Sequence, residues 1–279
     1  MVIVIVIVIV IVIVIVIIVV IVTIMVIIMV IISIVVIGIA VGIAIVAIGR
    51  NYAAHAAELA NPVPAAPVVF LKPTSAYIGP GEAIRVPMGV PELHHEVELC
   101  VVIGESAKGL DLPADPSPAA AKAGAGVDAA VDAAMAVVGG YALGLDMTAR
   151  EVQSVAKGKG LPWTEAKGRD TYAPISDLIA KDALGDDVHD VRLWAEVNGE
   201  LRQDGGATDM LFSVPYLVAY VSRLMSLAPG DVIMTGTPSG VGPVVPGDSI
   251  RVGLARGADN VAHADPVADL TFAVEQGMW

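Results

Sequence analysis

The sequence contains only one cysteine, and its N-terminal part contains no charged residues. The single Cys100 excludes an intrachain disulfide and a zinc site built from cysteines. No charged residue occurs from Met1 to Gly49, so all 16 Lys and Arg and all 29 Asp and Glu lie from Arg50 onward. The net charge of −13 belongs to about 230 residues, enough for one domain with a hydrophobic core. This acidity argues against nucleic acid or an anionic membrane surface as a partner.

Residues 1–37 are valine and isoleucine almost throughout. They are apolar enough for a membrane span, which needs about 20 residues, but flanking Lys or Arg and an aromatic belt are missing. The charged start of a signal peptide and the composition of a transit peptide are missing too. We expect residues 1–42 to be a mispredicted start or a dispensable extension, with a membrane anchor in 1–37 as the alternative. Residues 43–279 are expected to form the domain.

The rest of the chain is rich in strand patterns and poor in helical ones. Strands are expected in IAIVAIG, PVVFLKP, GEAIRVP, HHEVELCVVIG and DVIMTGTP, and a hairpin around Asn198-Gly199 in VRLWAEVNGELRQDG. Helices are expected in RNYAAHAAELANP, in the second half of residues 110–138, after Asp146, and in SVPYLVAYVSRLM. Because strands dominate in no regular βαβ order, the sequence predicts an α+β fold with a mixed, largely antiparallel sheet.

The strand pattern of HHEVEL puts two carboxylates on one face. Side chains alternate along a strand, so Glu96 and Glu98 are expected to point the same way. Like charges repel, and burying them unpaired is costly. Either this face is exposed to water, or a hard divalent cation such as Mg²⁺ lies between the carboxylates. The pair alone does not decide between the two interpretations.

Other polar side chains are candidates for the same site, and each has a simpler interpretation. Asp146, at a strand end, is either a third ligand or a helix-starting residue, with Thr148 as a candidate cap. His55 and Glu58 are spaced i, i+3, so Glu58 either orients His55 as a base or forms a surface pair with it. Lys167 is either a solvated lysine or a cation that faces an anionic substrate.

The segment TGTPSGVGPV is a Gly, Thr and Pro turn after an apolar strand. Its backbone donors and the hydroxyls of Thr235 and Thr237 are suited to holding a carboxylate; alternatively, the turn residues serve backbone geometry alone. It is not a phosphate loop, because the required Gly-Lys-Ser/Thr is missing.

These segments follow one another in a specific order from about residue 43 to the C-terminus. The order is GRNYAAHAAEL, PVVFLKP, HHEVELCVVIG, GYALGLDMTAREVQ, KGLPWTEAKGRDTYAPI, VNGELRQ and GDVIMTGTPSGVGPV. In this order they resemble the fumarylacetoacetate hydrolase family, above all its small single-domain branch of acylpyruvases and oxaloacetate decarboxylases. The resemblance implies the β-roll of that family's C-terminal domain, and a homodimer.

The resemblance also implies an activity and roles for single residues. The roles are metal ligation by Glu96, Glu98 and Asp146, catalysis by His55, Glu58 and Lys167, and substrate binding by Arg50, Gln153 and Thr237. The metal would be Mg²⁺ or Mn²⁺, and the substrate a small dioxo or 2-keto acid. The implied reaction is C–C cleavage, either hydrolysis of an acylpyruvate to pyruvate and a carboxylic acid or decarboxylation of oxaloacetate. The alternative is keto–enol tautomerisation of oxaloacetate or a related dioxo acid.

Three features depart from the family's pattern. The gap between Glu98 and Asp146 is longer than expected, and its Ala, Gly and Pro surplus near 112–135 is expected to form a surface loop. Ala54 stands where relatives often carry Asp, and Arg169 where an aromatic residue is usual, which would affect substrate choice. By resemblance the protein is expected in mitochondria or cytoplasm, with a membrane involved only if residues 1–37 anchor it.

Overall fold

The computed structural model describes residues 44–58, 63–121, 128–260 and 263–278, without the side chains of residues 55–57. The stretch 1–37 and the extension 1–42 lie outside the described residues, so the interpretations offered for them stay predictions. Within the described ranges, no helix is both long enough and apolar enough to cross a lipid bilayer. The chain from Ile43 to Trp279 forms one compact unit.

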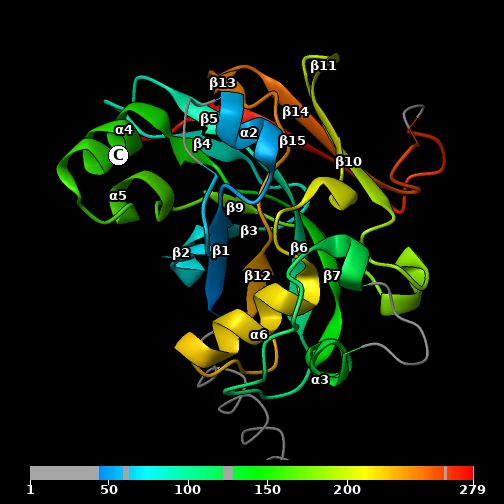
Figure 1. Ribbon diagram of the computed structural model, residues 1–279. Helices are drawn as coiled ribbons and strands as arrows, with labels where there is room; N and C mark the ends of the chain where they lie inside the picture. The colour runs from blue at the N-terminus through cyan, green and yellow to red at the C-terminus, as the bar shows by residue number, and fades with distance from the viewer. Residues whose placement is uncertain (1–43, 59–62, 122–127, 261–262, 279) are drawn as a thin grey trace, which may run out of the picture. The chain divides into compact units, whose positions relative to one another are not determined.

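One sheet carries the apolar, β-branched strands of the sequence (Figure 1). Its order is β2 (Val68–Lys72), β1 (Ile45–Gly49), β12 (Val232–Met234), β6 (Val97–Ile103) and β7 (Val138–Leu145). β1 and β12 pair in parallel, whereas the other neighbours pair antiparallel. Its central strands are buried along almost their whole length, as expected for strands covered on both faces.

A second sheet is built from the longer alternating strands. Its order is β11 (Glu200–Gly206), β10 (Val191–Val197), β14 (Ser249–Arg256), β15 (Ala268–Gln276) and β4 (Ile84–Val86). The predicted hairpin is confirmed: Asn198 and Gly199 join β10 to β11, with φ angles of 53° and 80°. Two positive φ angles are what a two-residue turn of type I′ requires, and Asn-Gly meets this need at little steric cost.

Two small sheets and a few helices complete the unit. The small sheets are β13 (Gly242–Val244), β5 (Leu93–His95) and β8 (Thr148–Ala149), and β3 (Tyr77–Ile78) with β9 (Ala173–Pro174). The helices are α2 (Ala53–Glu58), α3 (Ala129–Ala136), α4 (Arg150–Lys159), α5 (Thr164–Lys167) and α6 (Val214–Leu224). Mixed, mostly antiparallel sheets with few helices confirm the predicted α+β class.

The Ala, Gly and Pro insertion contains the helix expected in the second half of 110–138, and this helix is packed against the unit rather than forming part of a surface loop. Helix α3 lies beside α6 (Figure 1) and buries Ala130, Val131 and Ala134. Its N-cap Asp128 accepts hydrogen bonds from the backbone N–H of Ala130 at 3.0 Å and of Ala114 at 2.7 Å. Small apolar side chains let the two helices approach closely; residues 122–127 lie outside the described part.

Candidate active site

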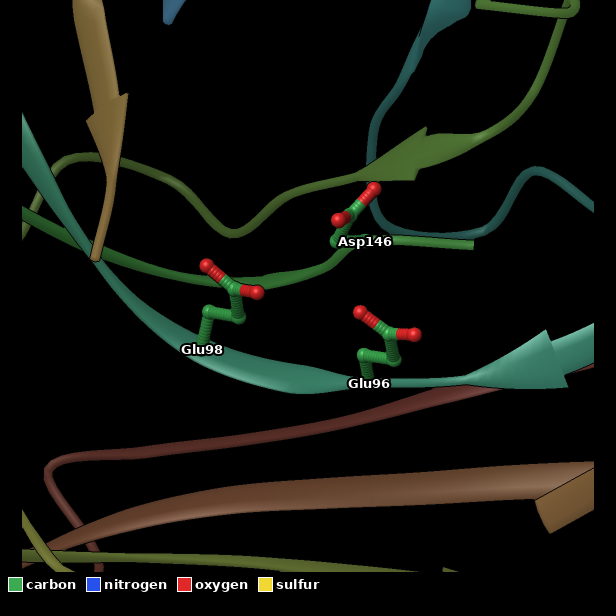
Figure 2. A group of neighbouring side chains, drawn as sticks. All are labelled: Glu96, Glu98 and Asp146. Atoms are coloured by element: carbon green, nitrogen blue, oxygen red, sulfur yellow. The ribbon is translucent and has the colours of Figure 1, made fainter. Parts of the chain in front are cut away.

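Glu96 and Glu98 are both buried, 5% and 2% exposed, so the interpretation of their face as exposed to water is wrong. They do not share one continuous strand as expected, because β5 ends at His95 and β6 begins at Val97. Glu96 therefore lies in the break between the two strands. Both side chains still project to the same side of the chain, toward Asp146 (Figure 2).

Asp146 directly follows β7, the antiparallel neighbour of β6. Its backbone N–H donates to the carbonyl oxygen of Glu96 at 2.8 Å, which joins the two segments where their carboxylates meet. Asp146 is not a helix-starting residue, because α4 begins at Arg150 with Ala149 as its N-cap. The prediction of Thr148 as a cap is also wrong: its hydroxyl donates to Glu96 Oε1 at 3.1 Å.

The three carboxylates form one cluster. Each of Glu96, Glu98 and Asp146 offers an oxygen atom, and these atoms lie within 4.8 Å of one another. Glu98 accepts a hydrogen bond from the backbone N–H of Gly236 at 2.7 Å, and within the described ranges no cationic side chain pairs with it. Burial, followed by the charges of Asp146 and Glu96, raises the pKa of Glu98 well above its ordinary value.

Two buried lysines face the cluster. Lys167 donates to Glu96 Oε2 at 2.8 Å and to Asp146 Oδ2. Burial alone would lower the pKa of Lys167, but the charges of Asp146 and Glu96 outweigh it and raise the pKa. Lys72 donates to the other oxygen of Asp146. Burial lowers the pKa of Lys72, although the charge of Asp146 acts to raise it. Sequence analysis missed Lys72; the signal was a lysine that ends an apolar strand in VVFLK.

The charge balance of this group makes it suitable for a divalent cation. The cluster offers only hard oxygen donors, which Mg²⁺ and Mn²⁺ prefer. Lys72 and Lys167 offset charge on Asp146 and Glu96, whereas Glu98 is left without an ion pair among the described residues. A buried, unpaired carboxylate is costly, and a bound cation would remove that cost. The residues present therefore fit the metal expected from the sequence.

Helix α4 brings a guanidinium and an amide to the cluster. Arg150 donates from Nη2 to Glu96 Oε1 and from Nη1 to Gln153 Oε1, both at 2.8 Å. Gln153, a predicted substrate-binding residue, is buried beside the site. Sequence analysis missed Arg150, although it lies in the quoted LDMTAREVQ. Burial and then the charges of Arg50 and Arg150 lower the pKa of Lys157, so these cations share one region of positive potential.

Two further predicted residues lie on the β1 and β12 sides of the site. Arg50 follows β1 and adopts a positive φ of 61°. Thr237 follows β12, and its hydroxyl donates to the carbonyl oxygen of Val97, between the two glutamates, at 2.7 Å. The structure thus brings Thr237 to the backbone of the carboxylate segment.

The predicted catalytic pair lies on the short helix α2. Glu58 is exposed, and its carboxylate accepts from the backbone N–H of Gly240 at 3.1 and 3.2 Å. The side chain of His55 lies outside what the structure describes, so its pairing with Glu58 stays a prediction. Of the two single-residue departures from the family's pattern, Ala54 is exposed and Arg169 donates to the carbonyl oxygen of Glu165 at 2.8 Å. Among the described contacts, neither residue bonds to the carboxylates.

Comparisons with known proteins identify the family to which this chain belongs. The family described as "Fumarylacetoacetate (FAA) hydrolase C-terminal" matches residues 44–265. Oxaloacetate tautomerase FAHD1, mitochondrial, of Arabidopsis thaliana is 51% identical over 210 residues, which are 75% of this chain and 85% of that protein. Oxaloacetate decarboxylase, mitochondrial, of Dictyostelium discoideum is 47% identical over 75% of this chain and 88% of its own.

A solved structure with the same fold was described with its ligands. It is fumarylpyruvate hydrolase from Pseudomonas aeruginosa in complex with Mn²⁺ and pyruvate, 30% identical with a TM-score of 0.67. The match covers 84% of this chain and 90% of that one. The fold type and the family expected from the sequence are therefore confirmed. This chain belongs to the fumarylacetoacetate hydrolase family and is one of its enzymes.

Proposed function

We propose that this chain is a divalent-metal-dependent enzyme that forms the enol or enolate of a small 2-oxo acid, with oxaloacetate as its substrate. The observation that carries the proposal is the buried cluster of Glu96, Glu98 and Asp146, in which Glu98 has no ion pair among the described residues. Relatives named oxaloacetate tautomerase and oxaloacetate decarboxylase support the choice of substrate. Tautomerisation and decarboxylation both need an enolate oxygen to be stabilised, so one site supports either reaction.

Glu96, Glu98 and Asp146 would hold Mg²⁺ or Mn²⁺. When bound, the cation would act as a Lewis acid toward the carbonyl and carboxylate oxygens of the substrate. The oxygen-only donor set supports this assignment, as does the Mn²⁺ in the fumarylpyruvate hydrolase of the same fold.

The chain's own cations would bind and orient the substrate. Lys167 has three ammonium donors, and its bonds to Glu96 and Asp146 leave one for a developing oxyanion. Arg150 and Gln153 lie next to it, and Arg50 adds positive potential, which suits a carboxylate of the substrate.

The two reactions differ in what leaves the carbon beside the carbonyl. In tautomerisation, a base removes a proton from that carbon and the carbonyl oxygen gains one; we assign the base to His55, oriented by Glu58. In decarboxylation, the electrons of the breaking C–C bond remain as the enolate while carbon dioxide departs, and the carbon is then protonated. Both reactions use Lys167 to stabilise the same oxygen.

Hydrolysis of an acylpyruvate is a second candidate. The fumarylpyruvate hydrolase of the same fold favours it. Here His55 would deprotonate a water that attacks the distal carbonyl, and Lys167 would stabilise the oxyanion. Cleavage would then release pyruvate enolate and a carboxylic acid.

The test uses the purified full chain, stripped with EDTA and resupplied with Mg²⁺ or Mn²⁺. Loss of the oxaloacetate enol, release of carbon dioxide and consumption of acetylpyruvate are followed in parallel. We expect metal-dependent turnover of oxaloacetate that is lost in Glu98→Gln and kept in Glu105→Gln, a matched change at an exposed glutamate. Enol loss without carbon dioxide would identify a tautomerase. Turnover that survives removal of the metal would refute the proposal.

Three further proposals rest on the resemblance or on the relatives. Location in mitochondria is supported by the relatives, whose names include that compartment. A homodimer follows from the resemblance alone. The division into an extension at 1–42 and a catalytic domain at 43–279 is supported by the family match over 44–265.

A further inference from the structure

Gln203 on β11 is a buried amide far from any predicted site residue in the sequence. The three residues before it on the strand are exposed, whereas Gln203 itself is 0% exposed. A fully buried glutamine must find hydrogen-bond partners inside the protein, because an unpaired amide is costly to bury. Its partners therefore reveal why it lies there.

All four hydrogen-bonding positions of the Gln203 amide are used. Its oxygen accepts from the backbone N–H of Val97 at 3.0 Å and lies 2.8 Å from His95 Nδ1. Its nitrogen donates to Thr237 Oγ1 at 2.7 Å and to the carbonyl oxygen of Pro238 at 2.9 Å. The backbone partners leave one orientation, because a flipped amide would set donor against donor at Val97. His95 Nδ1 must therefore carry a proton.

Three of the hydrogen bonds at Gln203 and Thr237 form a closed ring that begins and ends at Val97. Val97 donates its N–H to Gln203, Gln203 donates to Thr237, and Thr237 donates its hydroxyl to the carbonyl oxygen of Val97 at 2.7 Å. The pairing of β12 with β6 covers only Cys100 to Val102, so none of the described strands pairs with Val97 on that edge. The side chains of Gln203 and Thr237 take the place of the missing strand.

Val97 is the residue between Glu96 and Glu98. Its backbone conformation sets where both carboxylates point, and metal ligands must be placed to within a few tenths of an ångström. The same glutamine holds the loop at Thr237, whose neighbour Gly236 donates to Glu98 at 2.7 Å. Gln203 thus supports the carboxylates from the strand side and from the loop side without touching either one.

The loop from Gly236 to Gly240 also rests directly on β11. A Cβ atom at Gly240 would lie 1.9 Å from the carbonyl oxygen of Arg202, so the backbones are in contact there. Glu58 of α2 binds the N–H of the same Gly240. The loop from Gly236 to Gly240 therefore contacts β11 of the second sheet, the carboxylate of Glu98 and the carboxylate of Glu58 on α2.

We propose that Gln203 is a positioning residue for the metal-binding glutamates: its side-chain amide, acting as a substitute strand, holds Val97 and Thr237 so that Glu96 and Glu98 converge. The inference rests on the metal site proposed above. Removing a group that orients metal ligands typically weakens metal binding about 10- to 100-fold. The effect should therefore appear in metal affinity before any substrate is added.

The test measures Mn²⁺ binding to the EDTA-stripped full chain from the loss of the free Mn²⁺ signal in electron paramagnetic resonance. In Gln203→Met, which keeps the size but not the amide, we expect a Kd about 10-fold weaker and a higher KM for oxaloacetate. In Gln203→Asn, whose amide falls one methylene short, an intermediate Kd is expected. Asp204→Asn is the control: Asp204 is next to Gln203 on β11, and the change removes its ion pairs with Arg192 of β10 and with His263 but no bond to the site.

The outcomes separate this inference from the proposed function. Asp204→Asn should lower the thermal midpoint while its Kd and KM stay unchanged. A wild-type chain that binds Mn²⁺, with both Gln203 variants within twofold of its Kd, would overturn the positioning role alone. A wild-type chain that binds no Mn²⁺ would overturn the metal site and this inference with it. Failure of both Gln203 variants to fold while Asp204→Asn folds would make Gln203 a residue of stability only.

Discussion

The carboxylate cluster and the α2 segment hold the two halves of the proposed chemistry, and they are built in opposite ways. Glu96, Glu98 and Asp146 are buried at the junction of β5, β6 and β7, where Thr148 of β8 donates to Glu96 and Gly236 of the loop after β12 donates to Glu98. Glu58 lies on a six-residue helix, is exposed, and reaches the loop at Gly240. The proposed metal ligands are thus buried, whereas Glu58 in the segment of the proposed base is exposed.

This difference indicates which properties each region controls. A site on rigid strands keeps its geometry before any ligand arrives, which suits metal binding. The side chain of Glu58 on α2 is exposed, so burial contributes little to its position. We therefore expect changes in the cluster to alter metal binding, and changes in α2 to alter turnover alone.

The largest effect is expected from Glu98→Gln. Replacing the carboxylate by a neutral amide removes a charge that we assign to metal binding. Turnover should therefore fall by at least about 100-fold and Mn²⁺ binding should be lost. Without metal the variant should be at least as stable as wild type, because burial and like charges already disfavour ionised Glu98. Thermal midpoints in EDTA and Mn²⁺ titrations check both statements. A metal-free variant several degrees less stable would contradict the second.

The next effect is expected from Lys167→Met. It removes the buried ammonium that we assign to the oxyanion, so kcat should fall by about 100-fold. Mn²⁺ binding should persist, since all three carboxylates remain. Steady-state kinetics and a Mn²⁺ titration make the comparison, with Lys108→Met at an exposed lysine as the matched control. Unchanged kcat would exclude Lys167 from the reaction.

A smaller effect is expected from Glu58→Ala, the direct test of the contrast between the regions. Loss of the bond to Gly240 should lower kcat by about 10-fold or more. Because Glu58 is exposed, the free energy of unfolding should change by less than about 0.5 kcal/mol. The Mn²⁺ Kd should equal that of wild type and of the exposed control Glu105→Ala. A weakened Kd would mean that α2 belongs to the metal site.

The smallest effect is expected from Asp204→Asn on β11. Burial favours a higher pKa for Asp204, but hydrogen bonds from Arg192 and His263 outweigh it and hold the pKa below its ordinary value. A carboxyl with a lowered folded-state pKa stabilises above its unfolded pKa, about 3.9, and loses that contribution as pH falls through the folded value. The pair is partly exposed, so its contribution at pH 7 should be under about 1 kcal/mol.

Urea unfolding at several pH values measures this contribution. The difference between Asp204→Asn and wild type should be constant near neutral pH and should shrink on acidification below pH 4 or so. Turnover should be unchanged at pH 7. A difference that grows on acidification would contradict the assigned sign.

The cluster was largely predictable because its ligands share local patterns. Alternation in HHEVEL and a strand-ending Asp146 marked three carboxylates, and the burial of all three excludes the interpretation of that face as exposed to water. The assignment of Thr148 as a cap failed for a reason outside any local pattern. Its hydroxyl binds Glu96, and the helix begins two residues later, at Arg150.

The supporting residues were not predictable because their partners are remote. Lys72 and Asp146 are 74 residues apart, and Gln203 and Val97 are 106 apart. Gln203 does not differ locally from a surface residue of a strand, and Lys72 is marked only by its place at the end of an apolar strand, so the pairing of sheets is needed to reveal their burial. Arg150 was visible in LDMTAREVQ, but its distance to Glu96 depends on how α4 meets β5.

The most direct test of the account is the location of Mn²⁺ in crystals of the full chain, from anomalous scattering. The account predicts one strong peak among the carboxylates of Glu96, Glu98 and Asp146, absent in crystals of Glu98→Gln and retained in those of Glu58→Ala. No peak at the cluster in crystals of the active wild-type enzyme, or a peak unaffected by Glu98→Gln, would contradict it.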